Sequence, residues 1–303
     1  MSEPRLTPIA LFVYKRAMHT QKALESLSRC VSASESELFI FCDGTKEEGD
    51  AAGVQEVRRL VRQKQWCGKV NIIERETNTG VANSIIDGVT RLCNEYGRVI
   101  VLEDDLVVSS GFLRYMNEAL ERYQSEPQVM QISGYMFPVE VESDYTTFFL
   151  PFTTSWGWAT WQRAWVYFDP SAANYKVLKK DRAMRKAFDL EGGYPYYKML
   201  KSQLRGEIDS WAIRWYLCVF MRQGLVLYPP RTLIENIGFD GSGTHCGKHD
   251  IAQHGIAGGE AEVRESKFPK QLEVAMFNYE GVVGFMKMSN PRGVVNKIKG
   301  MFR

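Results

Sequence analysis

The segment RVIVLEDDLVVSS places three adjacent carboxylates, Glu103, Asp104 and Asp105, directly after an apolar run. Two like charges about 4 Å apart repel by roughly 4 kcal/mol at an effective dielectric near 20, so such acids need a compensating partner. Mg²⁺ and Mn²⁺ commonly take one or two carboxylates and complete their shells with phosphate oxygens and water. The pattern indicates a cation site, and a solvated acidic turn is the alternative.

The spacing of these acids also predicts their directions. In an extended strand end, successive side chains point to opposite sides. We therefore expect Glu103 and Asp105 on one side and Asp104 on the other, so the three acids need not share one ligand.

The elements that must position these acids are short apolar runs with almost no charge, typical of strands buried on both faces of a parallel sheet. They cover residues 9–14, 38–42 and 99–102. Helical patterns occupy residues 20–30, with Thr20 as the expected N-cap, and residues 81–96. The alternation predicts an α/β fold with a doubly wound, mostly parallel sheet.

Polar residues follow each of these runs. Lys15 and Arg16 follow the first, Asp43 and Gly44 the second, and the acids the third. Ligands of doubly wound sheets bind at the carboxyl ends of the strands. One crevice should therefore hold a basic residue, a single acid with a flexible turn, and the acidic cluster.

Composition sets the broad class. With 303 residues, 45% hydrophobic and 24% charged, the chain can bury a large core. A formal net charge of +2 is too small for a general nucleic-acid binder. The six cysteines have no C-x-x-C pair or zinc-ligand spacing and indicate buried thiols of a reducing compartment. The start of the chain lacks the features of a signal peptide, and no apolar stretch reaches about 20 residues, so we expect a cytoplasmic protein without a membrane span.

Two regions differ from the first 130 residues. From residue 131 the chain is richer in aromatic residues, with no linker before it, and should pack against the sheet. Residues 281–303 contain no acid and five basic residues, and we expect a separate basic C-terminal tail. This tail could hold the protein weakly to the inner face of a membrane as a peripheral protein, or it could be a solvated tail.

Several motifs, in order, resemble nucleotide-sugar-dependent glycosyltransferases of the GT-A fold. They are IALFVYKR, FIFCDG, VIVLEDDLVVSSGFLRYM, MQISGYMFP, SWGWATWQRAW, EIDSW and IENIGFDGSGTH, and they span about residues 8–245. The nearest likeness is to the N-acetylglucosaminyltransferase I group and to bacterial enzymes of polysaccharide biosynthesis. The resemblance implies a GT-A domain with a nucleotide-sugar-binding half, residues 1–130, and an acceptor and catalytic half, residues 131–280.

The resemblance also implies roles for residues after the three strands. Asp105 resembles the metal ligand, Asp104 a contact to the ribose or the donor sugar, and Glu103 a sugar contact. Asp43 resembles the acid that reads a uracil base, and Arg16 a basic residue near the nucleotide. A turn residue is the alternative for Asp43, and a surface residue for Arg16.

Further donor-site residues follow from the same resemblance. Asn78 and Gly80 match a donor-site loop, with a plain helix N-cap as the alternative. Trp158 matches a tryptophan that lines the donor or acceptor site, with a core position as the alternative. Ser242 and His245 fall in a glycine-rich loop that would contact the diphosphate and complete the metal shell, with a plain loop hydroxyl and a lone surface histidine as alternatives.

The general base should lie in RGEIDSWAIRW, where Glu207 and Asp209 precede a helix. The resembled group has an acid directly before the tryptophan, whereas here Ser210 occupies that position. We therefore select Asp209 as the base and keep Glu207 in reserve. Acids that only cap the helix are the alternative.

The implied function is a metal-dependent, inverting transfer of a sugar from a UDP-type donor to a hydroxyl of a glycan or lipid-linked glycan, with Mn²⁺ or Mg²⁺ as cofactor. A sugar nucleotidyltransferase is a competitor, but its usual glycine-rich loop is absent from VYKRAMHTQ. A non-catalytic carbohydrate-binding protein and a membrane-associated scaffold are the other competitors.

Overall fold

The computed structural model describes residues 6–143, 146–240 and 267–289. Within these ranges no helix is both long and apolar enough to cross a bilayer. Strands and helices alternate through the first half of the chain, and helices dominate much of the second.

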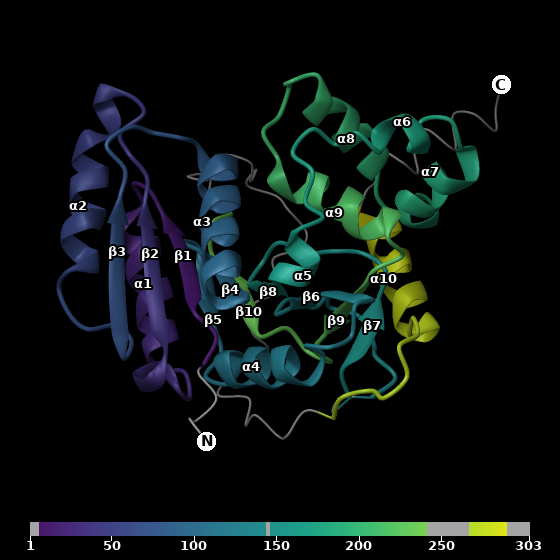
Figure 1. The fold of residues 1–303 in the computed structure, drawn as a ribbon, viewed down its shortest axis with the longest axis horizontal. Coiled ribbons are helices and arrows are strands. Elements are labelled where there is room, and N and C mark those ends of the chain that lie inside the picture. Colours follow the sequence, from purple (N-terminus) through teal and green to yellow (C-terminus); the bar gives the residue numbers. More distant parts are fainter. Residues whose placement is uncertain (1–5, 144–145, 241–266, 290–303) are drawn as a thin grey trace.

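An eight-stranded sheet, counted over the described residues, has the order β3-β2-β1-β4-β8-β6-β9-β7. Its strands are β1 (Ile9–Val13), β2 (Glu37–Cys42), β3 (Lys69–Glu74), β4 (Arg98–Glu103), β6 (Val129–Ser133), β7 (Phe148–Leu150), β8 (Trp158–Trp161) and β9 (Leu225–Tyr228). Four neighbouring pairs are parallel and three antiparallel. Beside this sheet, β5 (Leu106–Val108) pairs antiparallel with β10 (Ile234–Asn236). The expected α/β fold with a mostly parallel sheet is confirmed, and Figure 1 shows the sheet running from β3 to β7.

The helices surround this sheet. They are α1 (Ala17–Ser28), α2 (Ala51–Val61), α3 (Val81–Tyr96), α4 (Phe112–Arg122), α5 (Gln162–Trp165), α6 (Tyr175–Leu178), α7 (Arg182–Phe188), α8 (Tyr196–Leu204), α9 (Trp211–Met221) and α10 (Met276–Ser289). Short 3₁₀ turns occupy Ala33–Glu35, Glu48–Asp50 and Leu190–Gly192. In Figure 1, α6, α7 and α8 gather near α9, away from β1, β2 and β3.

Alternation along the strands divides the core between the two faces of the sheet. Phe12 and Phe41 stack at 4.9 Å between ring centroids and share one core with α3 and α9. Leu11 and Ile40 point to the other face and share a core with α1, α2 and α4. Because both faces are covered, these strands are apolar throughout, as the sequence predicted.

The predicted strands fall within one or two residues of those observed, and α3 matches its predicted range. The prediction for α1 is wrong at its start. The helix begins at Ala17, three residues before the expected N-cap, and Arg16 takes the N-cap position. Thr20 is buried, and its hydroxyl donates to the carbonyl of Arg16 at 2.9 Å instead of capping the helix.

The expected tail boundary at residue 281 also needs correction. That residue falls inside α10, in which Val282, Val283 and Met286 are buried against the second-half core. Apolar positions at helical spacing explain this packing. The tail was predicted from the basic residues of the segment, without regard to these apolar positions. Residues 290–303 lie outside the described ranges.

The five cysteines within the described ranges are buried and free, as predicted for thiols that serve as small apolar side chains. Burial raises the pKa of the Cys30, Cys42 and Cys93 thiols to about 12. They therefore stay protonated at neutral pH and are poor nucleophiles.

Candidate functional site

The carboxyl ends of β2, β1 and β4 lie side by side, because β1 pairs in parallel with both neighbours. Arg16, Asp43 and the acidic cluster follow these three ends. The predicted convergence of a basic residue and acids at one sheet edge is therefore present. Lys15 instead pairs with Asp50, which also accepts from the Tyr14 hydroxyl at 2.6 Å.

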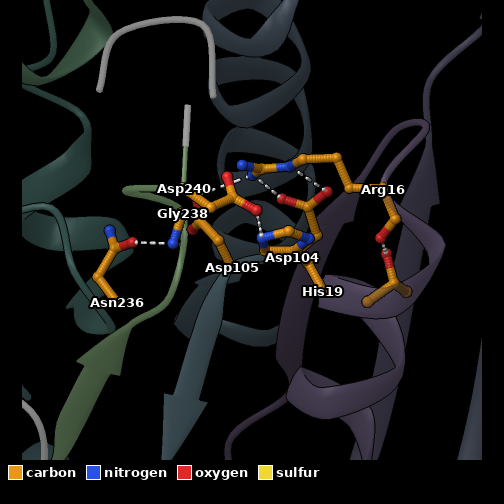
Figure 2. A network of polar contacts seen from close by, with 8 residues as sticks. Arg16, His19, Asp104, Asp105, Asn236, Gly238 and Asp240 are labelled. Atoms are coloured by element: carbon orange, nitrogen blue, oxygen red, sulfur yellow. Dashed lines mark hydrogen bonds and ion pairs between the residues drawn. The ribbon is translucent and has the colours of Figure 1, made fainter. Parts of the chain in front are cut away.

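Arg16 connects the acidic residues (Figure 2). Its Nη2 atom pairs with Asp104 Oδ1 and lies 2.8 Å from Asp105 Oδ2, while Nε lies 3.2 Å from Asp104 Oδ2. Asp104 is buried, and the side chains of Arg16 and Asp105 are 18% and 13% exposed. A forked guanidinium contact of this kind fixes geometry as well as charge.

The prediction that Asp104 and Asp105 point to opposite sides is wrong. Strand β4 ends at Glu103, and Asp104 and Asp105 form a turn. The alternation of an extended chain no longer applies in a turn, so both carboxylates reach the same guanidinium nitrogen.

The charges in this cluster shift the pKa values of neighbouring groups. Burial alone would lower the pKa of Arg16, but Asp104 and Asp105 outweigh it and raise that pKa, so the guanidinium is permanently charged. Burial, with the charges of Asp105 and Asp104, raises the pKa of Glu103 from 4.5 to about 8. Glu103 therefore carries a proton at neutral pH, whereas its two neighbours share one positive partner.

The segment after β10 packs against this cluster. The backbone N–H of Ile237 donates to the Asp105 carbonyl at 2.9 Å. A Cβ added to Gly238 would lie 2.3 Å from an Asp105 carboxylate oxygen, so any larger residue there would displace that carboxylate. Figure 2 shows His19 of α1 completing this side: its Nε2 lies 3.2 Å from Asp240 Oδ2.

Asp43 anchors the loop before α3. Its buried carboxylate accepts from the backbone N–H of Gly44 at 2.9 Å, of Thr79 at 3.0 Å and of Gly80 at 3.0 Å. The Thr79 hydroxyl adds a contact of 3.3 Å. Both carboxylate oxygens are thus engaged by the chain itself, and contact with a uracil base stays a prediction.

Asn78 and Gly80 belong to the same loop. The Asn78 amide donates to the Gly44 carbonyl at 2.9 Å, and its Oδ1 accepts from Gly80 N–H at 3.1 Å. Gly80 has φ +81°, a conformation that favours glycine. The loop is held in one shape at the amino end of α3, and its predicted donor contact is untested.

Asp209 comes to this loop from the second half of the chain. Its Oδ2 lies 3.8 Å from the position that a Cβ would take on Gly80, and its Oδ1 lies 3.4 Å from Arg214 Nη2. Glu207 instead faces Arg205 at 3.1 Å. Of the two candidate bases, Asp209 is the one that lies beside the Gly80 loop.

Trp158, predicted to line the donor or acceptor site, is a core residue in this structure. Its side chain is fully buried and stacks on Trp211 at 5.0 Å between ring centroids. As the first residue of β8 it pairs with both β4 and β6, so its ring points into the core beneath α9. It presents no ring face to a sugar in this arrangement.

Three residues near the site were missed at the sequence level. Trp156 is partly exposed and contacts Phe239 at 5.6 Å between ring centroids, next to Asp240. His19 follows Arg16 by one helical turn, a spacing that could have identified it, since residues three apart share a helix face. Asp240 gave no signal in the sequence.

The residues present fit a divalent cation in part. Asp104 and Asp105 direct oxygens to one point, the Nη2 atom of Arg16, so a positive group already stands where a hard cation would sit. Across the described parts of the chain, no group of three His, Cys, Asp or Glu side chains could hold a metal ion by itself. Two carboxylates suffice for Mg²⁺ or Mn²⁺ when phosphate oxygens and water supply the other ligands. Ser242 and His245 lie outside the described residues.

Comparison with known proteins gives structural matches alone: no protein-family model matches the sequence, and no curated protein matches it. Mouse xyloside xylosyltransferase 1 in its apo form matches at 12% identity and TM-score 0.38, over 70% of this chain and 80% of that one. The mannosyltransferase PcManGT from Pyrobaculum calidifontis, in complex with GDP-Man and Mn²⁺, matches at 12% and 0.35, over 59% and 50% of the two chains. Residues 1–349 of TarS from S. aureus match at 11% and 0.40, over 75% and 60%. At such identities and TM-scores, function has to be argued from this chain's own residues.

Proposed function

We propose that this protein is a glycosyltransferase that moves a sugar from a nucleoside diphosphate donor to a hydroxyl of a glycan or lipid-linked glycan. The observation that carries the proposal is the pair of carboxylates converging on Arg16 at the carboxyl ends of β1 and β4. Asp209 borders Gly80, in the loop between β3 and α3 that Asp43 holds. A cation-binding pair and a separate carboxylate are what transfer from a diphosphate leaving group requires.

In this proposal, Asp104 and Asp105 would hold a divalent cation, Mn²⁺ or Mg²⁺. When bound, such an ion neutralises the charge that develops on a leaving diphosphate. Glu103, protonated at neutral pH, can donate a hydrogen bond to a sugar hydroxyl. The loop held by Asp43 would position the nucleoside, for which uridine is the expected form.

Asp209 is the proposed general base. Its Oδ1 lies 3.4 Å from Arg214 Nη2 and its Oδ2 lies beside Gly80, and the side chain is 56% exposed, so an acceptor can reach it. It would take the proton of the acceptor hydroxyl while the hydroxyl oxygen attacks the anomeric carbon from the face opposite the diphosphate. The bond to the diphosphate breaks, and the configuration inverts. General-base catalysis of this kind contributes about 10²- to 10⁴-fold in rate.

The charge of the helices before Asp209 favours an acceptor that is negatively charged. Residues 175–205 hold nine basic and three acidic side chains, a net charge of +6 in a chain whose total is +2. Within them, Tyr175 and Tyr197 stack at 5.8 Å, and Arg185 and Lys201 lie 5.5 and 6.0 Å from the Tyr197 ring. Aromatic rings flanked by cations suit an anionic saccharide.

Nucleotide binding tests the donor side. Differential scanning fluorimetry with UDP, GDP and ADP, each with Mn²⁺ or EDTA, should show the largest rise in melting temperature with UDP and Mn²⁺. A larger rise in melting temperature with GDP would still support a glycosyltransferase but would contradict the choice of uridine. Equal, negligible shifts with all three nucleotides would contradict the donor site itself.

A further inference from the structure

The Nη2 atom of Arg16 lies between the carboxylates of Asp104 and Asp105, which are proposed to bind the metal. Nη2 is in contact with Asp104 and lies 2.8 Å from Asp105, and Nε makes a second contact to Asp104 at 3.2 Å. A divalent cation bound by the same two carboxylates would need that position. The guanidinium and such a cation would then compete for the same two carboxylates.

A second, independent observation shows that the guanidinium is incompletely bonded there. Its Nη1 is buried and has no hydrogen-bond partner among the described residues. A buried donor left unbonded is unfavourable, because it has lost its bonds to water without a replacement. An anionic oxygen on that side would remove the penalty, and a diphosphate supplies such oxygens.

The backbone at Arg16 is fixed, so an exchange would involve the side chain alone. The Arg16 carbonyl accepts from the backbone N–H and the hydroxyl of Thr20, both at 2.9 Å. This anchors Arg16 as the N-cap of α1 while its long side chain reaches Asp104 and Asp105. Rotation about side-chain bonds can move the guanidinium without disturbing the helix.

We propose that Arg16 is an exchangeable counter-ion: it neutralises Asp104 and Asp105 until a divalent cation takes its place, and then pairs with the donor's diphosphate. The inference rests on the proposed function, because it assigns the diphosphate as the new partner. A cation alone would leave the displaced guanidinium beside a second positive charge. Cation and nucleoside diphosphate should therefore bind together much more tightly than either binds alone.

The two possible roles of Arg16, competitor of the metal or support for the carboxylates, predict opposite effects of its removal on metal binding. If Arg16 only holds the carboxylates in place, its removal weakens metal binding. If it competes with the metal, its removal strengthens metal binding in the absence of nucleotide. The coupling between metal and nucleotide should then shrink, because the arginine that links them is gone.

Electron paramagnetic resonance of free Mn²⁺ measures this binding without any turnover. Wild type, Arg16→Ala and Arg16→Lys are titrated with Mn²⁺, with and without UDP. Arg91→Ala is the matched control, since it removes one arginine from a half-exposed pair with Glu95 on α3. We expect Arg16→Ala to bind Mn²⁺ alone at least tenfold more tightly than wild type, and Arg16→Lys to lie between, because an ammonium lacks the planar fork.

UDP should tighten Mn²⁺ binding at least tenfold in wild type and in Arg91→Ala, and only a few-fold in Arg16→Ala. Weaker or unchanged Mn²⁺ binding by both Arg16 variants would overturn the exchange, even if UDP binds normally. Suppose that the variants bind Mn²⁺ more tightly but UDP has no effect in wild type. Competition between Arg16 and the metal would then be supported, and the proposed nucleotide site would be contradicted. If Arg16→Ala does not fold in EDTA, Arg16→Lys alone decides by the same comparison.

Discussion

Asp209 Oδ2 lies 3.8 Å from the position that a Cβ would take on Gly80, so a carboxylate of the second half meets a loop of the first. The N–H of Gly80 donates to Asp43 at the end of β2. Through these contacts, the segment before α9 lies beside the loop that precedes α3. A carboxylate of the second half therefore borders a loop that Asp43 holds in the first half.

Replacing Asp209 by Asn should remove the base while keeping its size. We expect turnover to fall by about 10²- to 10⁴-fold, the usual contribution of a general base, with nucleotide affinity unchanged. Steady-state kinetics and calorimetric titration with UDP measure the two effects separately.

Glu207→Gln is the matched control for Asp209. This acid faces Arg205 and is half exposed, so its replacement should change turnover less than threefold. If Glu207→Gln caused the larger loss, the roles of the two acids would be reversed.

Asp43→Ala should destabilise the fold as well as the site. Its carboxylate accepts three backbone N–H groups, and each buried donor left unbonded costs about 1–3 kcal/mol. The Gly80 N–H keeps its bond to Asn78 Oδ1, so two donors lose their partner. We expect the free energy of unfolding in urea to fall by roughly 2–6 kcal/mol. A loss below about 0.5 kcal/mol would show that water replaces these bonds and that the loop does not depend on Asp43.

The sequence predicted the strands, α3 and the place where polar residues converge, because apolar runs and strand ends are local patterns. It did not predict which partners these residues would take. Arg16 meets Asp104 across 88 positions of sequence. The chain turns at Asp104 and Asp105, where the sequence predicted an extended strand end. Such contacts depend on tertiary packing.

Trp158 and Thr20 illustrate the same limit at single residues. A tryptophan beside glycine can bind a sugar or pack in the core. Trp158 is buried against Trp211 of α9 and is therefore a core residue. Thr20 suits an N-cap by type, but Arg16 takes that position because the helix starts earlier. Residue type alone did not separate these alternatives.

Glu103→Gln should change how stability depends on pH. The pKa of Glu103 is raised to about 8 in the fold, against 4.5 ordinarily, so the folded state retains a proton that the unfolded chain has lost between these values. Wild-type stability should therefore fall from pH 4.5 to 8, relative to the variant, by a few kcal/mol at about 1.4 kcal/mol per pKa unit.

Urea unfolding of both proteins in EDTA at pH 5 and pH 8 measures the difference. The two should be close at pH 5, and the variant more stable at pH 8. A constant difference between the two pH values would mean that Glu103 titrates alike in the folded and unfolded chains.

The acceptor surface is tested by the double variant Lys198→Gln/Lys201→Gln, which removes two exposed charges from α8. We expect it to elute from an immobilised heparin oligosaccharide at lower salt than wild type. The control, Lys22→Gln/Lys64→Gln, removes two exposed charges from the first half and should elute near wild type. Equal shifts in both would mean that total charge, and not this surface, governs the interaction.

The most direct measurement of the central claim is release of nucleoside diphosphate from a panel of nucleotide sugars by the purified protein with Mn²⁺. The account predicts slow hydrolysis of at least one UDP-sugar, abolished by EDTA and lost in a variant in which Asp104 and Asp105 are both replaced by Asn. Hydrolysis that survives in that double variant would contradict the site described. No release from any UDP-, GDP- or ADP-sugar, with or without a polyanionic glycan as acceptor, would contradict the assignment as a glycosyltransferase.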